Sequence, residues 1–185
     1  MLSETHQDFL GEFSKVDVHY KREHAPHAWI QSRDTTESQL NDLYDKHYHN
    51  PSKESKSILM SVLKNKNVGA GVLEDVADQH PDRDLRLRAA MSPNITYGSF
   101  NSAIEDEDLG VADTVAENPH LKPHQIKIAL EHEETSVRGN AASNPSIDKE
   151  GLSIALMDTE SYVRHNAKFN PKYKEYFPNG HEGLI

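Results

Sequence analysis

The sequence contains no cysteine, and this absence removes several chemistries at once. Disulfide bonds, thiolate zinc sites, iron–sulfur clusters and cysteine nucleophiles all require thiols. Long hydrophobic runs are also missing, because no stretch approaches the roughly 20 apolar residues of a membrane span. The first residues, MLSETHQDFLGEF, lack the basic start and the apolar run of a signal peptide. We therefore expect a soluble protein of the cytoplasm that does not bind membranes.

Apolar residues are scarce, at 35% of the 185 residues. Globular chains more often hold about 45–50%. The length suits one domain, or one domain with a small appendage, since domains commonly run to about 100–150 residues. We expect a thin core spread over a large surface.

The compact motifs of catalysis are absent as well: HExxH, GxSxG, the P-loop and GxGxxG do not occur. The chain does hold twelve histidines, but none of their clusters has paired-ligand spacing with a third ligand nearby. We predict a non-enzymatic protein with no catalytic residue, no cofactor and no metal site. The least favoured alternative is a histidine-based, metal-dependent enzyme. Its candidate clusters are His19/His24/His27, His47/His49 and His120/His124.

An internal repeat is visible when the chain is aligned on a recurring dipeptide that ends in proline. Four dipeptides follow one another at steps of 26 residues: Ser92-Pro93, Asn118-Pro119, Asn144-Pro145 and Asn170-Pro171. Apolar residues recur in the same columns, as Phe100, Ile126 and Leu152 illustrate. A further copy upstream needs a one-residue gap within 68–77, and a weaker one covers about 36–66. The chain is therefore organised as a tandem array.

Each unit has the pattern of two short helices. Apolar residues spaced i, i+3, i+4 mark the first helix, Thr96 and Asp148 suit its N-cap, and Pro123 suits its first position. The second helix has to end at the dipeptide, because a residue before proline is pushed out of the α region. Isolated helices shorter than about 12–15 residues are marginal in water. Stacking on neighbouring units is needed to bury their apolar faces, which predicts an all-α solenoid. The alternative is a compact helical bundle.

Two units, residues 137–145 and 163–171, read V-R-x-x-A-x-x-N-P. This pattern resembles the leucine-rich repeat variant family, which is similar to HEAT repeats. The resemblance covers residues 68–173 and implies a right-handed α-solenoid, here of about four to five two-helix repeats. The iron–sulfur module of some members needs cysteines, so it does not carry over. Arrays of this kind also occur in proteins of tailed bacteriophages, which hints at a viral origin.

We expect three regions from these patterns. Residues 1–35 would be an N-terminal cap or arm, residues 36–172 the helical repeat domain, with its clearest repeats at 92–170, and residues 173–185 a C-terminal cap or tail. The first region holds the only tryptophan, Trp29. It covers the open face of the first repeat in one interpretation and is a recognition arm in the other.

An arginine column accompanies the repeat at Arg86, Arg138 and Arg164, with Ala112 between them. The resemblance implies a structural role, in which each arginine bonds to an acid or a carbonyl in the adjoining loop. The alternative is a contact to phosphate.

The acidic residues are concentrated in the repeats. Residues 1–67 carry 9 basic and 10 acidic side chains, whereas residues 68–185 carry 11 and 20. Acids gather in the loop between the two helices of each unit, and equivalent loops of a solenoid lie along one edge, which predicts an acidic ridge. Helix capping explains one column of acids, namely Asp82, Asp108, Glu134 and Glu160. The partner-binding residues that we predict in this ridge are Glu105, Asp106, Glu107, Asp108, Glu131, Glu133, Glu134, Asp158 and Glu160.

The surplus acids serve either solubility or the attraction of a basic partner. They argue against direct nucleic-acid binding, which needs a basic stripe. We therefore predict an adaptor or scaffold that binds a protein with a basic patch, in an oligomeric state that the sequence does not define. The alternatives are a structural component of a larger assembly such as a virion, and a DNA mimic that inhibits a nucleic-acid-binding protein. Protonation of His132, which is flanked by Glu131 and Glu133, should weaken attraction of a cationic partner at low pH.

Overall fold

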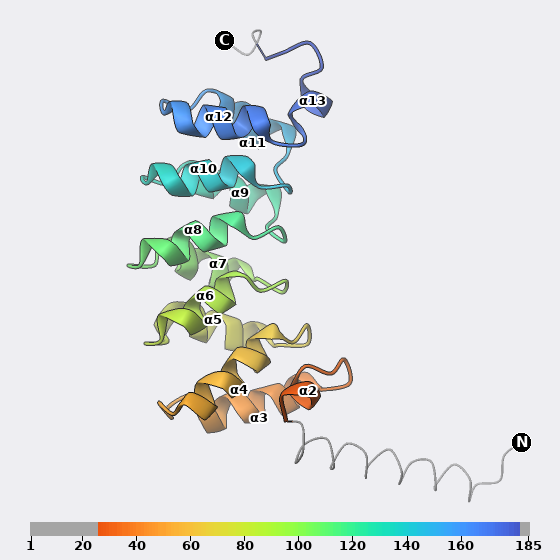
Figure 1. Cartoon of the computed structure of the whole chain (residues 1–185), viewed down its shortest axis with the longest axis vertical. Helices are drawn as coiled ribbons and strands as arrows, with labels where there is room; N and C mark the ends of the chain where they lie inside the picture. The colour runs from red at the N-terminus through yellow and green to blue at the C-terminus, as the bar shows by residue number, and fades with distance from the viewer. Residues whose placement is uncertain (1–25, 182–185) are drawn as a thin grey trace, which may run out of the picture. The chain divides into compact units, whose positions relative to one another are not determined.

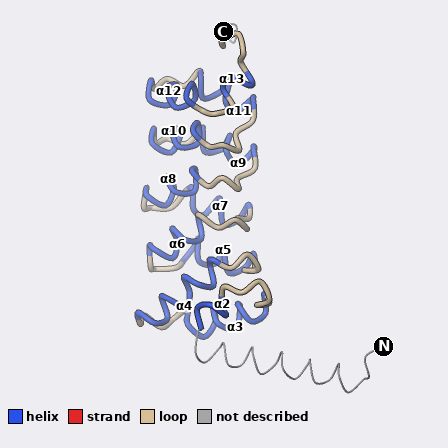
Figure 2. The backbone as a smooth tube through the Cα atoms, turned by 45° about the vertical axis from the view of Figure 1, so that its right-hand side comes forward, coloured by secondary structure: helices blue, strands red, loops and turns tan. Residues whose placement is uncertain are grey.

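The computed structural model describes residues 26–181, and these residues form helices, turns and loops without a strand (Figure 2). The predicted all-α class is confirmed. Contacts divide the chain into two compact units, Met1–Gly69 and Ala70–Ile185, which we call unit 1 and unit 2. Within residues 26–181, no helix combines the length and the apolar character that crossing a membrane requires.

Unit 1 holds α2 (Pro26–Ile30), α3 (Glu37–His47) and α4 (Lys53–Lys64). Thr36 closes a capping box with Gln39 at the start of α3, and Ser52 caps α4 through the backbone N–H of Ser55. Trp29 is buried, in the part of the predicted cap that the structure describes. Residues 1–25, with His19 and His24, lie outside the described residues.

Unit 2 contains four helix pairs followed by a single turn (Figure 1), and its second helices and the first helices from α7 onward begin at steps of 26 residues. The first helices contact one another in chain order, and so do the second helices. The pairs are α5 (Ala70–Gln79) with α6 (Arg83–Ala90), α7 (Tyr97–Ile104) with α8 (Leu109–Glu117), α9 (Pro123–Leu130) with α10 (Thr135–Ser143), and α11 (Lys149–Leu156) with α12 (Ser161–Phe169). A single helical turn, α13 (Tyr173–Tyr176), follows the last pair.

The helix starts match their predicted signals. Thr96 and Asp148 are the N-caps of α7 and α11, and each accepts a hydrogen bond from the backbone N–H three residues on. Pro123 is the first residue of α9, where a missing N–H costs no hydrogen bond. Since these helices have only eight residues each, their stability has to come from packing.

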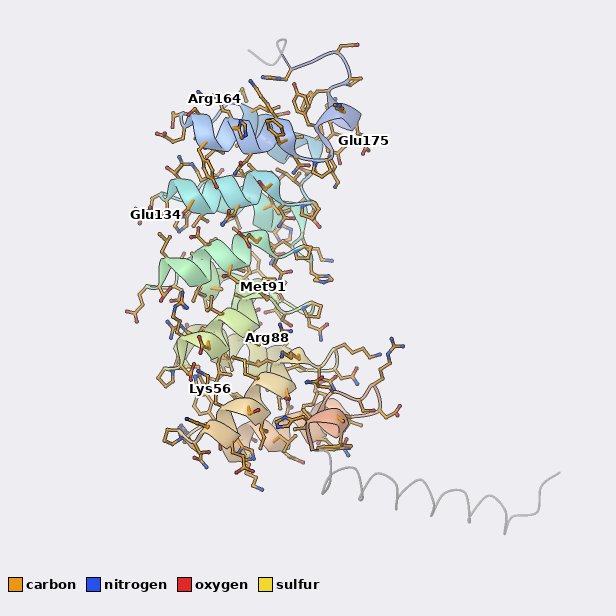
Figure 3. The ribbon with its side chains drawn as sticks, in the orientation of Figure 1. Lys56, Arg88, Met91, Glu134, Arg164 and Glu175 are labelled. Carbon is orange, nitrogen blue, oxygen red and sulfur yellow. The ribbon has the colours of Figure 1, made fainter. Side chains whose placement is uncertain are left out.

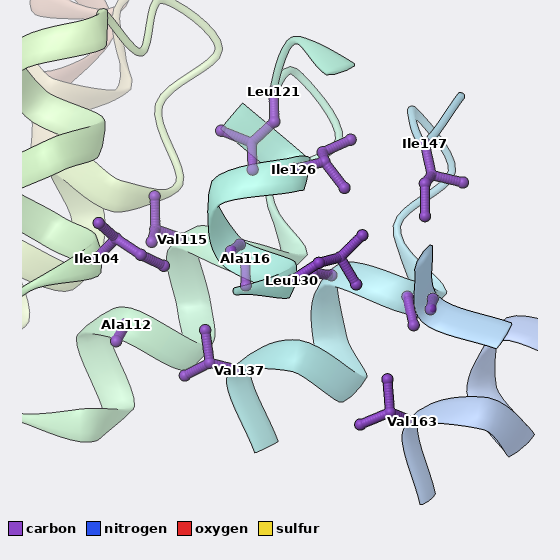
Figure 4. Close-up of a cluster of buried hydrophobic side chains, with 14 of the residues drawn as sticks. Ile104, Ala112, Val115, Ala116, Leu121, Ile126, Leu130, Val137, Ile147 and Val163 are labelled. Atoms are coloured by element: carbon purple, nitrogen blue, oxygen red, sulfur yellow. The ribbon is translucent and has the colours of Figure 1, made fainter. Parts of the chain in front are cut away.

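One cluster of buried apolar side chains runs through unit 2 from Ala90, at the end of α6, to Phe177 (Figure 4). Phe100, Ile126 and Leu152 occupy equivalent positions of successive pairs, and all three are fully buried. Small residues allow the second helices to approach closely. A Cβ atom at Gly139 in α10 would overlap the ring of Tyr162 in α12.

Buried asparagines join each helix pair to the one before it. The side-chain amide of Asn144 donates to the carbonyl oxygens of Ala116 and Asn118, at 2.8 and 3.0 Å, and its Oδ1 accepts from the N–H of Ser146. Asn118 and Asn170 make the same set of bonds in their own pairs. These residues were predicted only as helix ends. Their amides also satisfy buried backbone carbonyls that the preceding helix leaves free.

In unit 1, a buried asparagine that is not followed by proline makes the same pair of amide bonds. Asn65 precedes Lys66, yet its amide donates to the carbonyl oxygens of Ile30 and Ser32. Ser92, at the equivalent position of unit 2, accepts only the local bond from the N–H of Asn94. The hydrogen bonds to the preceding helices therefore come from the asparagine amide and do not require the proline that follows it.

Candidate binding surface at the acidic loops

The nine predicted ridge residues lie in three short loops, each joining the two helices of one pair in unit 2. Residues 105–108 join α7 to α8, residues 131–134 join α9 to α10, and residues 157–160 join α11 to α12. Figure 3 labels Glu134 where α10 begins. The structure thus places the nine residues at equivalent ends of successive helix pairs, and they divide there into two groups.

The first group is committed to contacts within the protein. Arg86 donates from Nε to Asp106 at 2.7 Å, and Arg138 donates from Nε to Asp158 at 2.8 Å. The two aspartate side chains are only 4% and 9% exposed. Asp106 and Asp158 therefore belong to the packing between pairs and offer no free carboxylate to a partner.

The protonation equilibrium of Asp158 reflects this environment. Burial by itself would raise the pKa of its carboxyl, but hydrogen bonds from Arg138 and from the N–H of Glu160 outweigh burial, so that the pKa is lowered. The charged form is thus the one that the fold stabilises.

Asp108 also acts within the protein. It caps α8 by accepting the N–H of Gly110, and its carboxylate pairs with Arg83. The hydrogen bond from Arg83 is the largest cause of the lowered pKa of Asp108. Asp82 caps α6 in the same way, whereas Glu134 and Glu160 occupy the N-cap positions of α10 and α12 without a capping side-chain bond. A capping hydrogen bond therefore accounts for the two aspartates of that column, whereas its two glutamates complement the helix dipole without such a bond.

The second group consists of glutamates that are exposed and form no ion pair within residues 26–181. We call them the six exposed glutamates: Glu105, Glu107, Glu131, Glu133, Glu134 and Glu160. Because they lie on neighbouring loops without an ion pair, they repel one another and attract cations. Within the protein, Glu107 attracts Arg86, and Glu134 and Glu160 attract Arg138.

Two hollows open beside these loops. The first, of about 630 Å³, is lined by Asp78, Arg86 and Glu105 among others, between the loops of the α5/α6 and α7/α8 pairs. The second, of about 580 Å³, lies between the loops of the α7/α8 and α9/α10 pairs, with Ala112 and Glu134 in its lining. Both hollows combine carboxylates with apolar side chains, so a long cationic side chain matches them better than an anion does.

The arginine column has the structural role that the resemblance implied. Arg138 donates to the carbonyl oxygens of His132 and Glu133 as well as to Asp158. Arg164 has only carbonyl partners, Asp158 and Thr159, at 2.6 and 2.7 Å. The guanidinium groups of Arg86 and Arg138 are thus occupied by protein acceptors, which leaves them unsuited to bind phosphate, whereas both bonds of Arg164 come from Nη1.

Sequence reasoning missed a second column, in which histidine and aspartate alternate. His80, Asp106, His132 and Asp158 are each 26 residues apart, and each side chain accepts the backbone N–H two residues further on. The Nε2 atom of His132 lies 3.1 Å from the carbonyl oxygen of Ile104. Because a carbonyl only accepts, Nε2 carries the hydrogen and Nδ1 is the acceptor. The regular spacing was the available signal.

The remaining histidines between residues 26 and 181 lie at separate places. His27 and His47 contact the hydroxyls of Ser61 and Ser55, at 2.9 and 2.8 Å. Burial is the largest cause of the lowered pKa of His47. His120 and His124 are exposed. Within residues 26–181, no three histidine or carboxylate side chains are grouped as metal ligands.

Large apolar side chains are exposed on α12, the second helix of the last pair. Phe169 and Tyr162 of α12 are 75% and 51% exposed, and the ring of His165 lies 4.4 Å from that of Phe169. Tyr162 lies at the start of α12, next to the loop that holds Glu160, and Phe169 lies at the end of the same helix.

Comparisons with known proteins give no relative for this chain: no family model, no curated protein and no solved structure matches it significantly.

Proposed function

We propose that this protein is a non-enzymatic adaptor whose acidic loops bind a protein with a basic patch. The observation that carries the proposal is the division among the ridge residues. Asp106, Asp108 and Asp158 are used in packing and capping, whereas the six exposed glutamates form neither an ion pair nor a capping side-chain bond within the described residues. Their mutual repulsion costs stability, which a purely structural surface would not need to tolerate.

We also propose that the helix pairs form a right-handed α-solenoid of about four to five HEAT-like repeats, of the leucine-rich repeat variant type. Three features support this architecture: the 26-residue recurrence of helix bounds, the ordered contacts between equivalent helices, and the bonds of the buried asparagines. A solenoid presents equivalent loops side by side, and an extended partner can bind along them.

The test compares two double variants that remove the same charge. Glu107→Gln/Glu133→Gln removes two of the exposed glutamates, and Glu117→Gln/Glu175→Gln removes two exposed glutamates elsewhere in unit 2. Binding partners are captured from the source cells by the wild-type protein and then titrated with each purified variant. We expect at least about a tenfold loss of affinity for the first variant and little change for the second.

Salt provides the independent arm of this experiment. Raising the salt to about 0.5 M should release the partner, because screening weakens attraction between exposed charges. A partner that stays bound in high salt and to the Glu107→Gln/Glu133→Gln variant would refute the proposal.

A second candidate is a structural component of a larger assembly, and the exposed side chains of Tyr162 and Phe169 favour it. Such an assembly would bury apolar surface and be insensitive to salt. Light scattering of the purified protein separates the two, since an adaptor keeps one defined mass while an assembly component grows with concentration.

A further inference from the structure

One position in the arginine column holds no arginine. Arg86, Ala112, Arg138 and Arg164 are each 26 residues apart in equivalent places of the second helices. At residue 112 the side chain ends at Cβ and is buried. The second hollow, of about 580 Å³, opens next to it between the α7/α8 and α9/α10 pairs.

The neighbouring repeats show how this fold holds a guanidinium. Arg138 uses Nη1 for the carbonyl oxygens of His132 and Glu133, at 3.0 and 2.9 Å, and Nε and Nη2 for the carboxylate of Asp158. Arg86 combines the carbonyl oxygen of His80 with the carboxylate of Asp106. Loop carbonyls and one carboxylate of the next loop therefore make up the site in each case.

Part of that site is preserved around Ala112. The carbonyl groups equivalent to those of His132 and Glu133 belong to Asp106 and Glu107, and neither accepts a side-chain hydrogen bond within the described part of the chain. The aspartate of the next loop is replaced by His132, whose Nε2–H is directed to the carbonyl oxygen of Ile104. Negative charge comes instead from Glu107, Glu133 and Glu134, which line the hollow.

The apolar part of the hollow fits the stem of a long side chain. Ile104, Leu109 and Ala112 contribute to its lining, and Leu109 is 40% exposed at its mouth. An arginine stem can lie against such residues while its head reaches the carbonyls and carboxylates. The planar guanidinium offers five N–H donors and is more weakly hydrated than an ammonium, so it suits a partly buried site with several acceptors better than lysine.

We infer that the hollow beside Ala112 binds an arginine side chain of the basic partner, in place of the arginine that the other repeats supply themselves. The inference rests on the proposed function, because it assumes a basic partner at the acidic loops. It adds the chemical group that is recognised and the repeat that recognises it.

The probes are two acetylated and amidated peptides of equal length, one alternating arginine with glycine and the other lysine with glycine. Each is titrated into the full-length wild-type protein, Ala112→Arg and Glu117→Gln. The first variant fills the hollow from within, and the second makes the same change of one charge on α8 outside the hollow. We expect the wild type to bind the arginine peptide about tenfold more tightly than the lysine peptide. Ala112→Arg should lose that preference, and Glu117→Gln should keep it.

Amide NMR shifts of the wild type give a readout that does not depend on any variant. The arginine peptide should shift the amide signals of Leu109, Ala112 and Glu133 more than the lysine peptide does. If Ala112→Arg fails to fold, Ala112→Gln fills the hollow without a charge and should lower affinity for the arginine peptide in the same direction.

The outcomes separate the inference from the proposed function. Equal, salt-sensitive binding of both peptides by the wild type and both variants would overturn the arginine site and leave the acidic-loop proposal intact. Failure of the wild type to bind either peptide at low salt would count against both.

Discussion

At the scale of single residues, the molecule depends on buried polar side chains that bond to backbone groups. Asn144 is 1% exposed and bonds to two carbonyl oxygens and one N–H, all from backbone. His80 is buried and accepts the N–H of Asp82. Such residues stabilise the fold because removing them leaves several buried groups without partners at once.

Replacement of Asn144 by alanine should be strongly destabilising. The substitution leaves the carbonyl oxygen of Ala116 without its side-chain donor and the N–H of Ser146 without its acceptor, whereas the carbonyl oxygen of Asn118 keeps the N–H of Leu121. Each unsatisfied buried group costs about 1–3 kcal/mol. We expect the free energy of unfolding in urea to fall by about 2–4 kcal/mol. Ser143→Ala, at the exposed neighbouring position, is the control and should stay within about 0.5 kcal/mol of the wild type. Equal effects of the two substitutions would disprove the role of the amide.

His80 should make stability depend on pH. Burial is the largest cause of its lowered pKa, which lies below the ordinary value of 6.5 in the folded chain. The unfolded chain therefore binds more protons as the pH falls below 6.5, and the folded state loses stability in that range. His80→Asn keeps an acceptor for the N–H of Asp82 and does not titrate, so its urea midpoint should fall less than that of the wild type between pH 7.5 and 5.5.

The control for this pH experiment is His120→Asn, at an exposed position. It should show the same pH dependence as the wild type. If His80→Asn also retained the full wild-type dependence, His80 would not be its source.

At the scale of helices, the loops between paired helices decide both capping and the contact to the next pair. Asp108 caps α8, whereas Glu134 at the equivalent position of α10 makes no capping bond. Arg138 of α10 reaches across to Asp158 in the following loop. The loops at residues 105–108 and 157–160 thus end one helix, start another and receive an arginine side chain from the previous pair.

Glu134→Asp should stabilise the protein without changing its charge. The shorter carboxylate can accept an N–H of the first turn, as Asp108 does from Gly110, and a good N-cap contributes about 1 kcal/mol. We expect the free energy of unfolding to rise by about 0.5–1 kcal/mol. Glu133→Asp is the matched control one residue earlier, and it should change stability by less than about 0.5 kcal/mol. A gain of equal size in the control would show that capping is not responsible.

The chain contains two different residue combinations at this contact between pairs: Arg138 with Asp158 in one repeat, and Ala112 with His132 at the equivalent positions one repeat earlier. Arg138→Ala should cost about 3 kcal/mol or more, since it leaves Asp158 as a nearly buried charge without its partner. The double variant Arg138→Ala/Asp158→His reproduces the natural combination of Ala112 and His132, and it should recover much of that loss. Urea unfolding of the two single variants and the double variant forms a thermodynamic cycle. Additive losses would show that the two positions are not coupled.

At the scale of the whole molecule, charge is distributed unevenly along the chain. Residues 68–185 carry 20 acidic and 11 basic side chains, and the six exposed glutamates lie on neighbouring loops. Repulsion among them opposes folding and weakens as salt rises.

Glu107→Gln/Glu133→Gln should therefore stabilise the protein at low ionic strength, by a few tenths of a kcal/mol or more. The gain should shrink when thermal unfolding is repeated in about 0.3 M salt, where charges are screened beyond roughly 6 Å. Glu117→Gln/Glu175→Gln, with the same change in net charge, should gain less. The same substitutions that weaken partner binding are thus expected to strengthen the fold, and a loss of stability on their introduction would contradict this account.

The sequence by itself determined the helices and their register. Spaced apolar residues, the N-caps Thr96 and Asp148, and the helix ends before Pro119 and Pro145 are local signals. Local backbone sterics and hydrogen bonds act through neighbours in the chain, so the 26-residue pattern was sufficient to place α7 to α12.

Only the tertiary structure decided which polar residues are available to a partner. Asp106 and Glu107 are adjacent acids in one loop, yet Asp106 is buried against Arg86 and Glu107 is exposed. Likewise, the hollow beside Ala112 is lined by the loops of two successive helix pairs, which only the fold brings together. Burial and hollows depend on which side chains of a neighbouring helix pair come into contact. Composition and local spacing do not determine those contacts, because the residues involved are far apart in the sequence.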